Sequence, residues 1–204
     1  IIFDTDVDRS AIVLRKGAPI NRNSLIALIA AIILKEHPGS TIVTDSVTSD
    51  GLAEFIIQHG GKHHRFKRGY KNVIDEGIRL NKSGEECWLA IETSGHCALR
   101  ENFFLDDGAF LVAKLIVQAA RMRKDGKELQ DLISSLQQPA ESVEVRFKVN
   151  ADDVAEYGQA VLDRVSTVAP TIDGWKVVCP NYEGVRISCT NEDEQGWFLL
   201  RKSL

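Results

Sequence analysis

The sequence predicts an α/β domain followed by a smaller α+β domain. In the first half of the chain, short β-branched runs alternate with segments of helical periodicity, which is typical of a parallel α/β layer. After Gln137-Gln138-Pro139 the pattern changes to apolar residues at every second position, which favours a half-buried strand and a new domain. With 204 residues, 44% of them apolar and 26% charged, the chain is long enough for two small domains with real cores.

The elements of the first domain follow from local patterns. Strands are expected where β-branched or apolar runs lie between turn residues, at 12–14, 41–44, 63–66 and 88–91. Helices are expected where apolar residues recur at helical spacing, at 22–36, 50–59, 70–80 and 107–122. Asn21 or Asn23 is the expected N-cap of the first helix, and His37-Pro38-Gly39 is expected to end it.

The second domain is expected to be α+β. Its first strand is predicted from the alternation of Val143, Val145, Phe147 and Val149. An amphipathic helix is predicted at 151–165, and short strands are predicted at 175–178, 184–188 and 197–200.

Both ends of the chain are expected to be cuts in a longer protein. Ile1-Ile2-Phe3 has the character of the end of a buried strand, and a mature protein seldom starts inside a strand. At the other end, a strand runs into Arg201-Lys202-Ser203 and stops. We therefore expect the chain to be a fragment that lacks its N-terminal part.

Composition excludes several classes of partner. The 25 Lys and Arg against 29 Asp and Glu give a net charge of −4, so no overall field attracts nucleic acid. The apolar run 25–34 is too short for a membrane span, which takes about 20 residues. The 4 cysteines show no C-x-x-C spacing and the chain shows no signal peptide. We expect reduced thiols and a cytoplasmic protein, or a stromal one in a plant plastid, that is not secreted.

Three carboxylates, Asp4, Asp6 and Asp8, follow the first apolar run at alternate positions. Carboxylates crowded in this way raise one another's pKa unless a cation lies among them. A ligand set made only of oxygen atoms favours magnesium, which usually completes its octahedron with water and substrate phosphate. The loop Asp4–Arg9 is therefore predicted to bind Mg²⁺ beside a phosphorylated small molecule.

Three alternatives compete with this interpretation. An EF-hand needs Gly at the sixth loop position and Glu at the twelfth, where this chain has Arg9 and Arg15. A haloacid dehalogenase-type phosphatase would use Asp4 as its nucleophile and Asp106-Asp107 as its late acidic pair, but a third carboxylate in line has no role there. The remaining alternative is a solvated turn, since Asp is common in loops.

The segment Glu92-Thr93-Ser94-Gly95-His96 follows the strand predicted at 88–91, at the strand end where open α/β sheets place ligands. A carboxylate, a hydroxyl and an imidazole together suit the vicinal hydroxyls of a sugar. The alternative is a turn with a helix-capping Ser.

Two basic segments are candidate phosphate sites. In the segment Lys62–Lys71, Gly69 permits a tight turn and a predicted helix starts just after it. Lys71 lies where the N-terminal amides of that helix favour an anion. Arg201 and Ser203, next to backbone amides, would make a phosphate cradle. Each segment has a plain alternative, a solvated basic edge for the first and an exposed strand end for the second.

Taken in order, these segments resemble the α-D-phosphohexomutases, the phosphoglucomutase and phosphomannomutase family. Asp4–Arg9 is similar to the family's D-G-D-x-D-R magnesium loop, and Glu92–His96 is similar to its G-E-x-S-G-H sugar-binding loop. Leu105-Asp106-Asp107-Gly108 resembles its F-x-D-D-G helix start. Asp173-Gly174 or Glu183–Arg186, followed by Gly196–Ser203, resembles the approach to its phosphate-binding loop.

The resemblance implies a fold and a division into domains. It implies a Rossmann-like three-layer α/β domain with a mixed sheet, followed by a smaller α+β domain like the TATA-binding protein. Residues 1–17 would be the end of the second family domain, which carries the metal loop. Residues 18–138 would be the third, sugar-binding domain, and residues 139–204 a truncated fourth, phosphate-binding domain.

The resemblance also implies a reaction, the interconversion of the 1- and 6-phosphates of glucose, mannose or an amino sugar. The phosphate exchanges with a phosphoserine in the first family domain through a bisphosphorylated sugar. The implied metal ligands are Asp4, Asp6 and Asp8, and the implied catalytic residues are Arg9 and His96. The implied substrate-binding residues are Glu92, Ser94, His96, Lys71, Arg201 and Ser203.

The sequence departs from the family pattern in three places. It contains no T-A-S-H-N-P-like segment with the nucleophilic Ser, so the chain alone is not expected to turn over and its partner is expected to be the missing N-terminal part. In the family, a Lys often follows the equivalent of Asp45. Val47 and its neighbours lack this Lys, which leaves Lys71 or Lys67 as substitutes. The phosphate loop breaks off at Leu204. A sugar-phosphate-binding module without catalysis therefore remains an alternative function.

Overall fold

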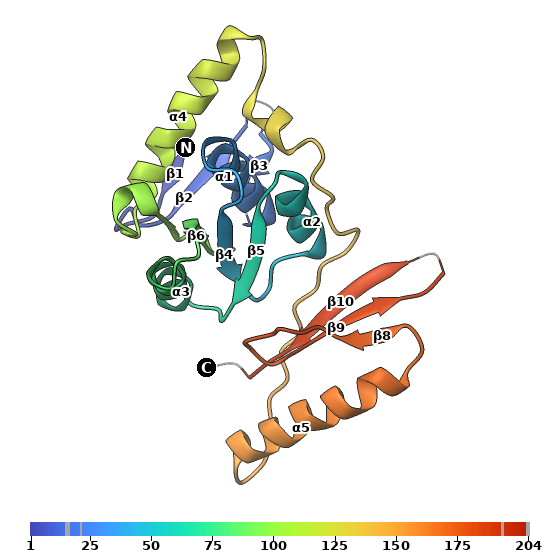
Figure 1. Ribbon diagram of the computed structural model, residues 1–204. Helices are drawn as coiled ribbons and strands as arrows, with labels where there is room; N and C mark the ends of the chain where they lie inside the picture. The colour runs from blue at the N-terminus through green and yellow to red at the C-terminus, as the bar shows by residue number, and fades with distance from the viewer. Residues whose placement is uncertain (15–16, 21, 193, 203–204) are drawn as a thin grey trace. The chain divides into compact units, whose positions relative to one another are not determined.

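The computed structural model describes residues 1–14, 17–20, 22–192 and 194–202. The chain forms two compact units, Ile1–Pro139 and Ala140–Leu204 (Figure 1). Each unit has its own sheet and helices, and each is described here by itself. Within the described residues, no helix combines the length and the apolar character that crossing a membrane requires. The four cysteines are free thiols, of which Cys87 and Cys97 are buried.

A four-stranded mixed sheet forms the centre of the first unit (Figure 1). The strand order is β5 (Lys62–Phe66), β4 (Thr41–Asp45), β6 (Cys87–Ile91) and β7 (Cys97–Leu99). β4 pairs in parallel with both β5 and β6, whereas β7 runs antiparallel to β6. The short connection between β6 and β7 permits only the antiparallel arrangement, since a parallel crossover takes a dozen or more residues. The mixed sheet expected from the sequence is confirmed.

Helices cover both faces of this sheet. Side chains of successive strand residues point to opposite faces, so Ile42 and Leu89 face one side while Val43 and Ala90 face the other. The first side packs against α1 (Arg22–Glu36) and α2 (Asp50–Gln58), and the second against α3 (Tyr70–Lys82). The resulting three layers are the α/β architecture predicted from the sequence.

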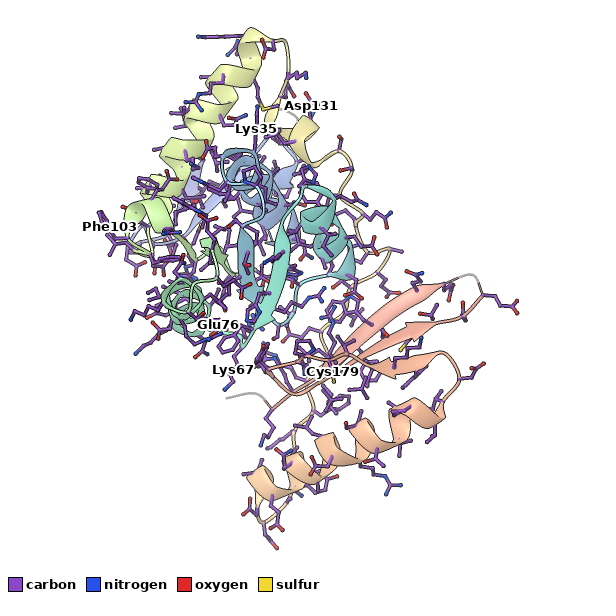
Figure 2. The ribbon with its side chains drawn as sticks, viewed as in Figure 1. Lys35, Lys67, Glu76, Phe103, Asp131 and Cys179 are labelled. Carbon is purple, nitrogen blue, oxygen red and sulfur yellow. The ribbon has the colours of Figure 1, made fainter. Side chains whose placement is uncertain are left out.

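A small antiparallel sheet and a long helix complete the first unit. The sheet has the order β1 (Ile2–Phe3), β2 (Ser10–Val13) and β3 (Pro19–Ile20). The buried strand expected at the chain start is wrong in one respect, because Ile2 is 58% exposed in a two-residue edge strand. After β7 come η1 (Arg100–Asn102) and α4 (Gly108–Lys124), and η2 (Leu129–Ile133) follows α4. Phe103, between η1 and α4, is 87% exposed (Figure 2).

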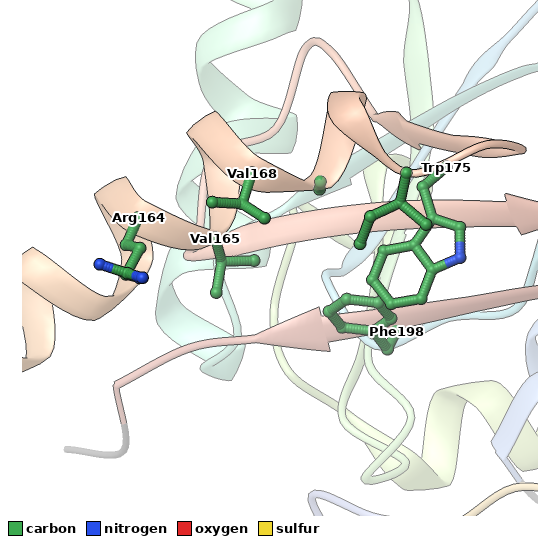
Figure 3. Close-up of a pocket in the computed structure, with 7 residues that line it drawn as sticks. Arg164, Val165, Val168, Trp175 and Phe198 are labelled. Atoms are coloured by element: carbon green, nitrogen blue, oxygen red, sulfur yellow. The ribbon is translucent and has the colours of Figure 1, made fainter.

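The second unit packs one long helix on an antiparallel sheet. The sheet has the order β10 (Gln195–Leu200), β9 (Val185–Thr190) and β8 (Trp175–Val177). The helix α5 (Val154–Val168) continues into η3 (Ala169–Thr171). Figure 3 shows an apolar groove between this helix and the sheet, where Trp175 and Phe198 meet edge to face at 5.3 Å. This α+β unit is the smaller second domain that the sequence predicts.

One predicted strand of the second unit is wrong. The segment 143–149 is not in a strand, and Val143 and Phe147 are 70% and 78% exposed. Alternation of apolar residues favours a strand only where a neighbouring strand supplies hydrogen bonds and a covered face. No described strand pairs with this segment, so Val143, Val145 and Phe147 remain exposed.

Candidate functional site

The carboxyl ends of the parallel strands converge on one edge of the central sheet. β4 ends at Asp45, β5 is followed by the turn at Gly69, and β6 is followed by Glu92. Because the three strands are parallel, the segments that follow them meet at the same edge. This is the edge at which the sequence predicts a ligand.

The loop Asp4–Arg9 is the turn between β1 and β2 of the small sheet. Phe3 pairs with Ser10, so the six residues between them form the hairpin connection. Val7 has a positive φ of 65°, which is strained for a β-branched residue. The Val7 carbonyl accepts a 3.1 Å hydrogen bond from the amide of Gly108, the first residue of α4. The start of α4 thus holds the strained tip of the loop.

Arg9 lies among the carboxylates of its own loop. Its Nε donates a 2.5 Å hydrogen bond to Asp4 Oδ2, and its amide donates to Asp4 Oδ1 at 3.2 Å. Burial opposes ionisation of Asp4, but these hydrogen bonds and the positive charge of Arg9 outweigh it and place the pKa of Asp4 below its usual value. Arg9 therefore supplies the positive charge that keeps Asp4 ionised.

The three aspartates of the loop are arranged as a cation site would require. One carboxylate oxygen from each of Asp4, Asp6 and Asp8 lies within 4.8 Å of the others. Asp8 Oδ1 is buried and, among the described residues, has no hydrogen-bond partner, although Arg9 Nε lies 3.6 Å away as an ion pair. A buried acceptor without a donor is unfavourable unless a ligand satisfies it. The oxygen-only donor set and this unsatisfied atom fit a hard cation such as Mg²⁺.

His96 joins the metal loop to the candidate sugar loop. Its backbone forms an antiparallel bridge with Arg9, 87 residues earlier in the chain. Its Nδ1 lies 2.7 Å from Asp106 Oδ2 and 3.5 Å from Asp8 Oδ2. The Tyr70 ring stacks on the imidazole, with 4.8 Å between the ring centroids. Two motifs that are far apart in the sequence thus form one site.

Asp106 fixes the orientation of His96. Its second oxygen, Oδ1, accepts a 3.1 Å hydrogen bond from the amide of Cys97. Burial raises the pKa of Asp106, and the opposing attraction of His96 only partly offsets it. With Oδ1 held by a backbone donor, Oδ2 accepts from Nδ1 of His96 and leaves Nε2 free for other contacts. A carboxylate in this position sets the tautomer of the imidazole.

The Glu92 carboxylate is held by hydrogen bonds from a backbone amide and a neighbouring hydroxyl. It is only 5% exposed, and its Oε1 accepts a 2.5 Å hydrogen bond from the amide of Gly69. Its Oε2 accepts from the hydroxyl of the exposed Ser94 at 2.8 Å. A carboxylate oxygen has two lone pairs, so each can accept one further bond from a ligand hydroxyl. The same loop is tied to β4, since the Thr93 hydroxyl donates to Asp45 Oδ2 at 2.6 Å.

The basic segment 62–71 separates into two kinds of residue. Arg65 is not a free cation, because it donates to Ser49 O at 2.7 Å and to Asp50 Oδ1 at 2.8 Å. Lys71 is exposed in the first turn of α3, two residues after the Gly69 amide that contacts Glu92. Lys67 is exposed as well. Lys71 and Lys67 are therefore available to an anion, and Arg65 is part of the scaffold.

Arg201 belongs to the second unit. It lies just after β10, and its NH1 donates a 3.3 Å hydrogen bond to Glu183 Oε1. Ser203, its predicted partner in a phosphate cradle, lies outside the described residues. The structure thus brings together Asp4–Arg9, Glu92–His96 and Asp106 within the first unit.

Sequence reasoning missed the roles of three residues at this edge. The sequence places Asp106 only in a motif and in the late acidic pair of the phosphatase alternative, Asp45 only as a reference point, and Tyr70 only at a helix start. The signal for Asp45 was present, because it is a carboxylate at the end of a predicted parallel strand. No local pattern indicates that Asp106 or Tyr70 contacts His96.

Comparison with known proteins gives a consistent result. A family model described as phosphoglucomutase/phosphomannomutase, alpha/beta/alpha domain III, matches residues 21–139. A phosphomannomutase/phosphoglucomutase of Pseudomonas syringae is 28% identical over 204 residues, which are 100% of this chain and 40% of that relative. A phosphoglucosamine mutase of Nitratidesulfovibrio vulgaris is 28% identical over 93% of this chain and 40% of its own length.

A solved structure shows the same fold. It is a phosphoglucomutase/phosphomannomutase family protein from Burkholderia thailandensis, with a TM-score of 0.75 and 26% identity. The match covers 98% of this chain and 39% of that one. The chain thus spans about 40% of the length of the curated relatives that it matches.

Proposed function

The chain belongs to the phosphoglucomutase/phosphomannomutase family, and we propose that it is the metal-binding and sugar-binding part of a Mg²⁺-dependent phosphohexomutase. The reaction is the interconversion of the 1- and 6-phosphates of a hexose through a phosphoserine and a bisphosphorylated sugar. Within it, residues 1–17 end the second family domain, 18–138 form the third and 139–204 belong to the fourth. The match of residues 21–139 to a model of domain III supports this division.

The junction at His96 is the observation that carries the proposal. The backbone bridge between Arg9 and His96 places the carboxylate loop next to the loop that carries Glu92 and Ser94. Transfer of a phosphoryl group to a sugar hydroxyl requires both a charge-stabilising group and a group that orients the hydroxyl. This edge of the sheet supplies both.

Each residue of the junction has a role that follows from its surroundings. Glu92 and Ser94 accept and donate hydrogen bonds to sugar hydroxyls and thereby orient the ring. His96, with Nδ1 directed to Asp106, presents Nε2 to accept or donate a proton at the reacting hydroxyl. Arg9 stabilises negative charge on the phosphoryl group, for which it would leave Asp4.

Three aspartates hold the cation in this proposal. Asp4, Asp6 and Asp8 present oxygen ligands, and Asp8 Oδ1 is the buried acceptor that has no hydrogen bond within the described part of the chain. When bound, Mg²⁺ would neutralise charge on the transferring phosphoryl group. Lys71 and Arg201 are proposed phosphate contacts, and Ser203 is assigned with Arg201 from the sequence motif alone.

The test is an assay of the full-length protein that carries this chain, with glucose 1-phosphate, mannose 1-phosphate and glucosamine 1-phosphate. The curated relatives include phosphomannomutase/phosphoglucomutase and phosphoglucosamine mutase, so all three substrates are needed. We expect Mg²⁺-dependent formation of the 6-phosphate from at least one of them. Glu92→Gln should lower kcat/KM by about tenfold or more, because a carboxylate accepts hydrogen bonds about twice as strongly as an amide. The absence of isomerisation with all three substrates would refute the proposal.

Assays of the same proteins also distinguish two alternative functions from a mutase. A dehalogenase-type phosphatase predicts hydrolysis by the chain alone that Asp4→Asn abolishes. The structure does not favour it, because both oxygens of Asp4 are engaged by Arg9. A non-catalytic sugar-phosphate-binding module predicts binding of these substrates without turnover by the full-length protein, and an upstream coding segment in frame with a phosphorylatable Ser would argue against it.

A further inference from the structure

Asp45 is a buried carboxyl group beside the sugar loop that the proposed function does not yet use. It is the last residue of β4 and is 0% exposed. A carboxyl group in such a place is unfavourable to bury, and a neutral residue would fill the same volume at lower cost. Its presence at the ligand edge of the sheet therefore calls for a reason beyond packing.

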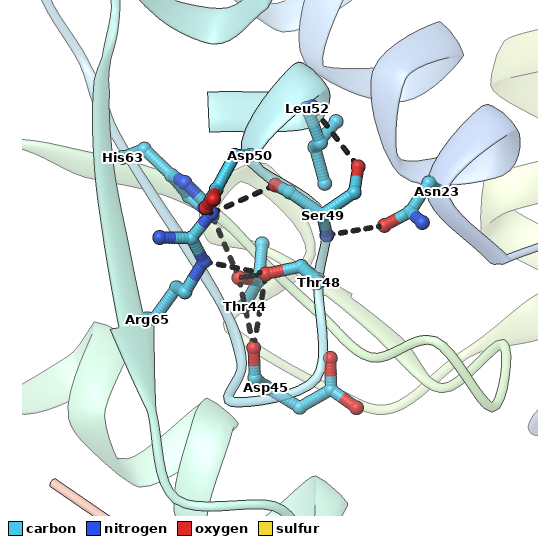
Figure 4. Close-up of polar contacts among 9 residues, drawn as sticks. All are labelled: Asn23, Thr44, Asp45, Thr48, Ser49, Asp50, Leu52, His63 and Arg65. Carbon is cyan, nitrogen blue, oxygen red and sulfur yellow. Dashed lines mark hydrogen bonds and ion pairs between the residues drawn. The ribbon is translucent and has the colours of Figure 1, made fainter. Parts of the chain in front are cut away.

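The backbone of Asp45 is fixed by a polar network behind it (Figure 4). The Thr48 hydroxyl donates to the Asp45 carbonyl at 3.2 Å and lies 3.1 Å from the Thr44 hydroxyl. Arg65 donates to the same Thr48 hydroxyl at 3.2 Å and to Ser49 O at 2.7 Å. This network joins the start of α2 to β5 and leaves little freedom for the turn after β4.

The carboxyl group of Asp45 points away from this network (Figure 4). Its Oδ2 accepts the 2.6 Å hydrogen bond from the Thr93 hydroxyl. Its Oδ1 is buried and has no hydrogen-bond partner among the residues that the structure describes. Within those residues, the side chain is therefore tied to the loop Glu92–His96 through Thr93, by its hydroxyl and by a weaker interaction with its backbone amide.

The far end of the loop is held at His96, which bridges Arg9 and contacts Asp106, and the turn itself is closed by short-range hydrogen bonds. The Glu92 amide donates to His96 O at 2.9 Å, and the Gly95 amide donates to Glu92 O at 3.0 Å, so the loop is a closed turn. These bonds fix the shape of the turn but not its direction relative to the sheet. The bond from Thr93 to Asp45 ties the turn to the neighbouring strand, and the bond from Gly69 to Glu92 ties it to α3.

We propose that Asp45 is a positioning residue for the sugar loop: through the Thr93 hydroxyl it fixes the direction in which Glu92 and Ser94 face the sugar hydroxyls. A short hydrogen bond to a carboxylate is about twice as strong as a neutral one, which suits a contact that must hold a loop in one direction. The inference rests on the proposed function, since it assigns Glu92 and Ser94 to sugar binding.

The first experiment compares Thr93→Val, Thr93→Ser and Asp45→Asn in the full-length protein. Thr93→Val keeps the shape of the side chain and removes the donor, so KM for the sugar 1-phosphate should rise about tenfold with kcat within about threefold. Thr93→Ser retains the hydroxyl and should restore KM to within about threefold of the original value. A purely structural role would instead lower the amount of active enzyme and leave KM unchanged.

The double variant tests whether the two residues act through one bond. In Asp45→Asn the amide oxygen still accepts from Thr93 but without charge, so its KM should lie between those of the original protein and Thr93→Val. The combination of Asp45→Asn with Thr93→Val should raise KM no further than Thr93→Val alone. Additive effects, or an unchanged KM in Thr93→Val, would overturn the inference.

A second measurement does not depend on activity. Hydrogen exchange of the Glu92 and Gly95 amides in the chain should be faster in Thr93→Val, while the amides of Leu89 and Ile91 in β6 should exchange as before. If the original protein isomerises none of the sugar phosphates, the proposed function fails, and exchange alone then decides whether Asp45 positions the loop. Unchanged exchange at Glu92 and Gly95 would refute the positioning role itself.

Discussion

Asp106 and His96 form a pair in which each oxygen of the carboxylate has a separate task. Oδ1 accepts from the Cys97 amide and Oδ2 from His96 Nδ1. A backbone N–H can only donate, so the atom opposite Cys97 must remain an acceptor. Replacing Asp106 by Asn would therefore change the atom at Oδ2, opposite His96, and keep an acceptor at Oδ1.

Asp106→Asn is expected to reverse the tautomer of His96. The amide oxygen must face the Cys97 N–H, which places the amide nitrogen, a donor, opposite Nδ1. His96 then carries its proton on Nε2 instead of Nδ1, and kcat should fall by at least about a hundredfold. Nitrogen-15 NMR of the imidazole measures the tautomer directly. Asp125→Asn, at an exposed position, is the matched control, and retention of the Nδ1–H form in Asp106→Asn would contradict the expectation.

Asp45 gives the folded chain a specific dependence on pH. Burial is the largest cause that raises its pKa to about 6, the charge of Glu92 adds to this, and Thr93 and Arg68 oppose it. Between pH ~4 and ~6 the folded state therefore binds more protons at this site than the unfolded state does, so its contribution to stability falls as pH rises. Above pH ~7 the contribution is constant and unfavourable, by about 3 kcal/mol.

Asp45→Asn removes this titration. The free energy of unfolding of the variant, measured relative to the original chain by urea titration, should increase by about 3 kcal/mol between pH ~4 and ~7. A difference that does not vary with pH would show that Asp45 titrates normally.

At the scale of elements, the first residue of α4 controls the metal loop. A Cβ atom added at Gly108 would lie 2.8 Å from Val7 O and 3.0 Å from the carbonyl carbon of Arg9. Both are backbone atoms of the loop, so the contact cannot be relieved by turning a side chain. The loop and the helix therefore depend on a glycine at this position.

Gly108→Ala should destabilise the chain by about 1–3 kcal/mol and weaken Mg²⁺ binding several-fold. Ala is otherwise the better residue in a helix by about 1 kcal/mol, so a net loss would identify the clash as its cause. Gly196→Ala is the matched control, because nothing lies within 4 Å of the added Cβ. Thermal unfolding and a Mg²⁺ titration measure the two effects. A more stable Gly108→Ala chain with unchanged Mg²⁺ affinity would show that the loop is not held by α4.

The elements show what a sequence pattern can predict. The helix at 22–36 has the predicted bounds because ten consecutive apolar residues, 25–34, can only be buried. The segment 143–149 has an equally clear pattern but is exposed, because a strand also needs a partner that lies elsewhere in the chain. The site divides in the same way. Its loops were predicted from local motifs, whereas the contacts of His96 with Asp106 and of Thr93 with Asp45 depend on how strands are paired.

At the scale of the whole molecule, the loop Asp4–Arg9 would offer a cation only an incomplete coordination shell. Three carboxylates supply oxygen atoms, and Arg9 competes with a cation for Asp4. Magnesium sites that use few carboxylates are usually completed by water and a phosphate group. The chain spans about 40% of the length of its curated relatives, and we propose that the phosphoserine that supplies this oxygen lies in the remainder.

This proposal predicts how Mg²⁺ affinity depends on the rest of the protein. For the 204-residue chain, calorimetry should give a Kd on the order of 1 mM or weaker, because Arg9 must leave Asp4 and water must fill the other positions. The phosphorylated full-length protein should bind more tightly by at least about tenfold, since the phosphoserine oxygen adds a charged ligand, and its dephosphorylated form should approach the value of the chain. Asp6→Asn in the chain serves as the control that the weak signal comes from the loop. Micromolar affinity in the chain alone would mean that the loop is a complete site, and a mutase that shares its metal with a phosphoserine would then be the wrong interpretation.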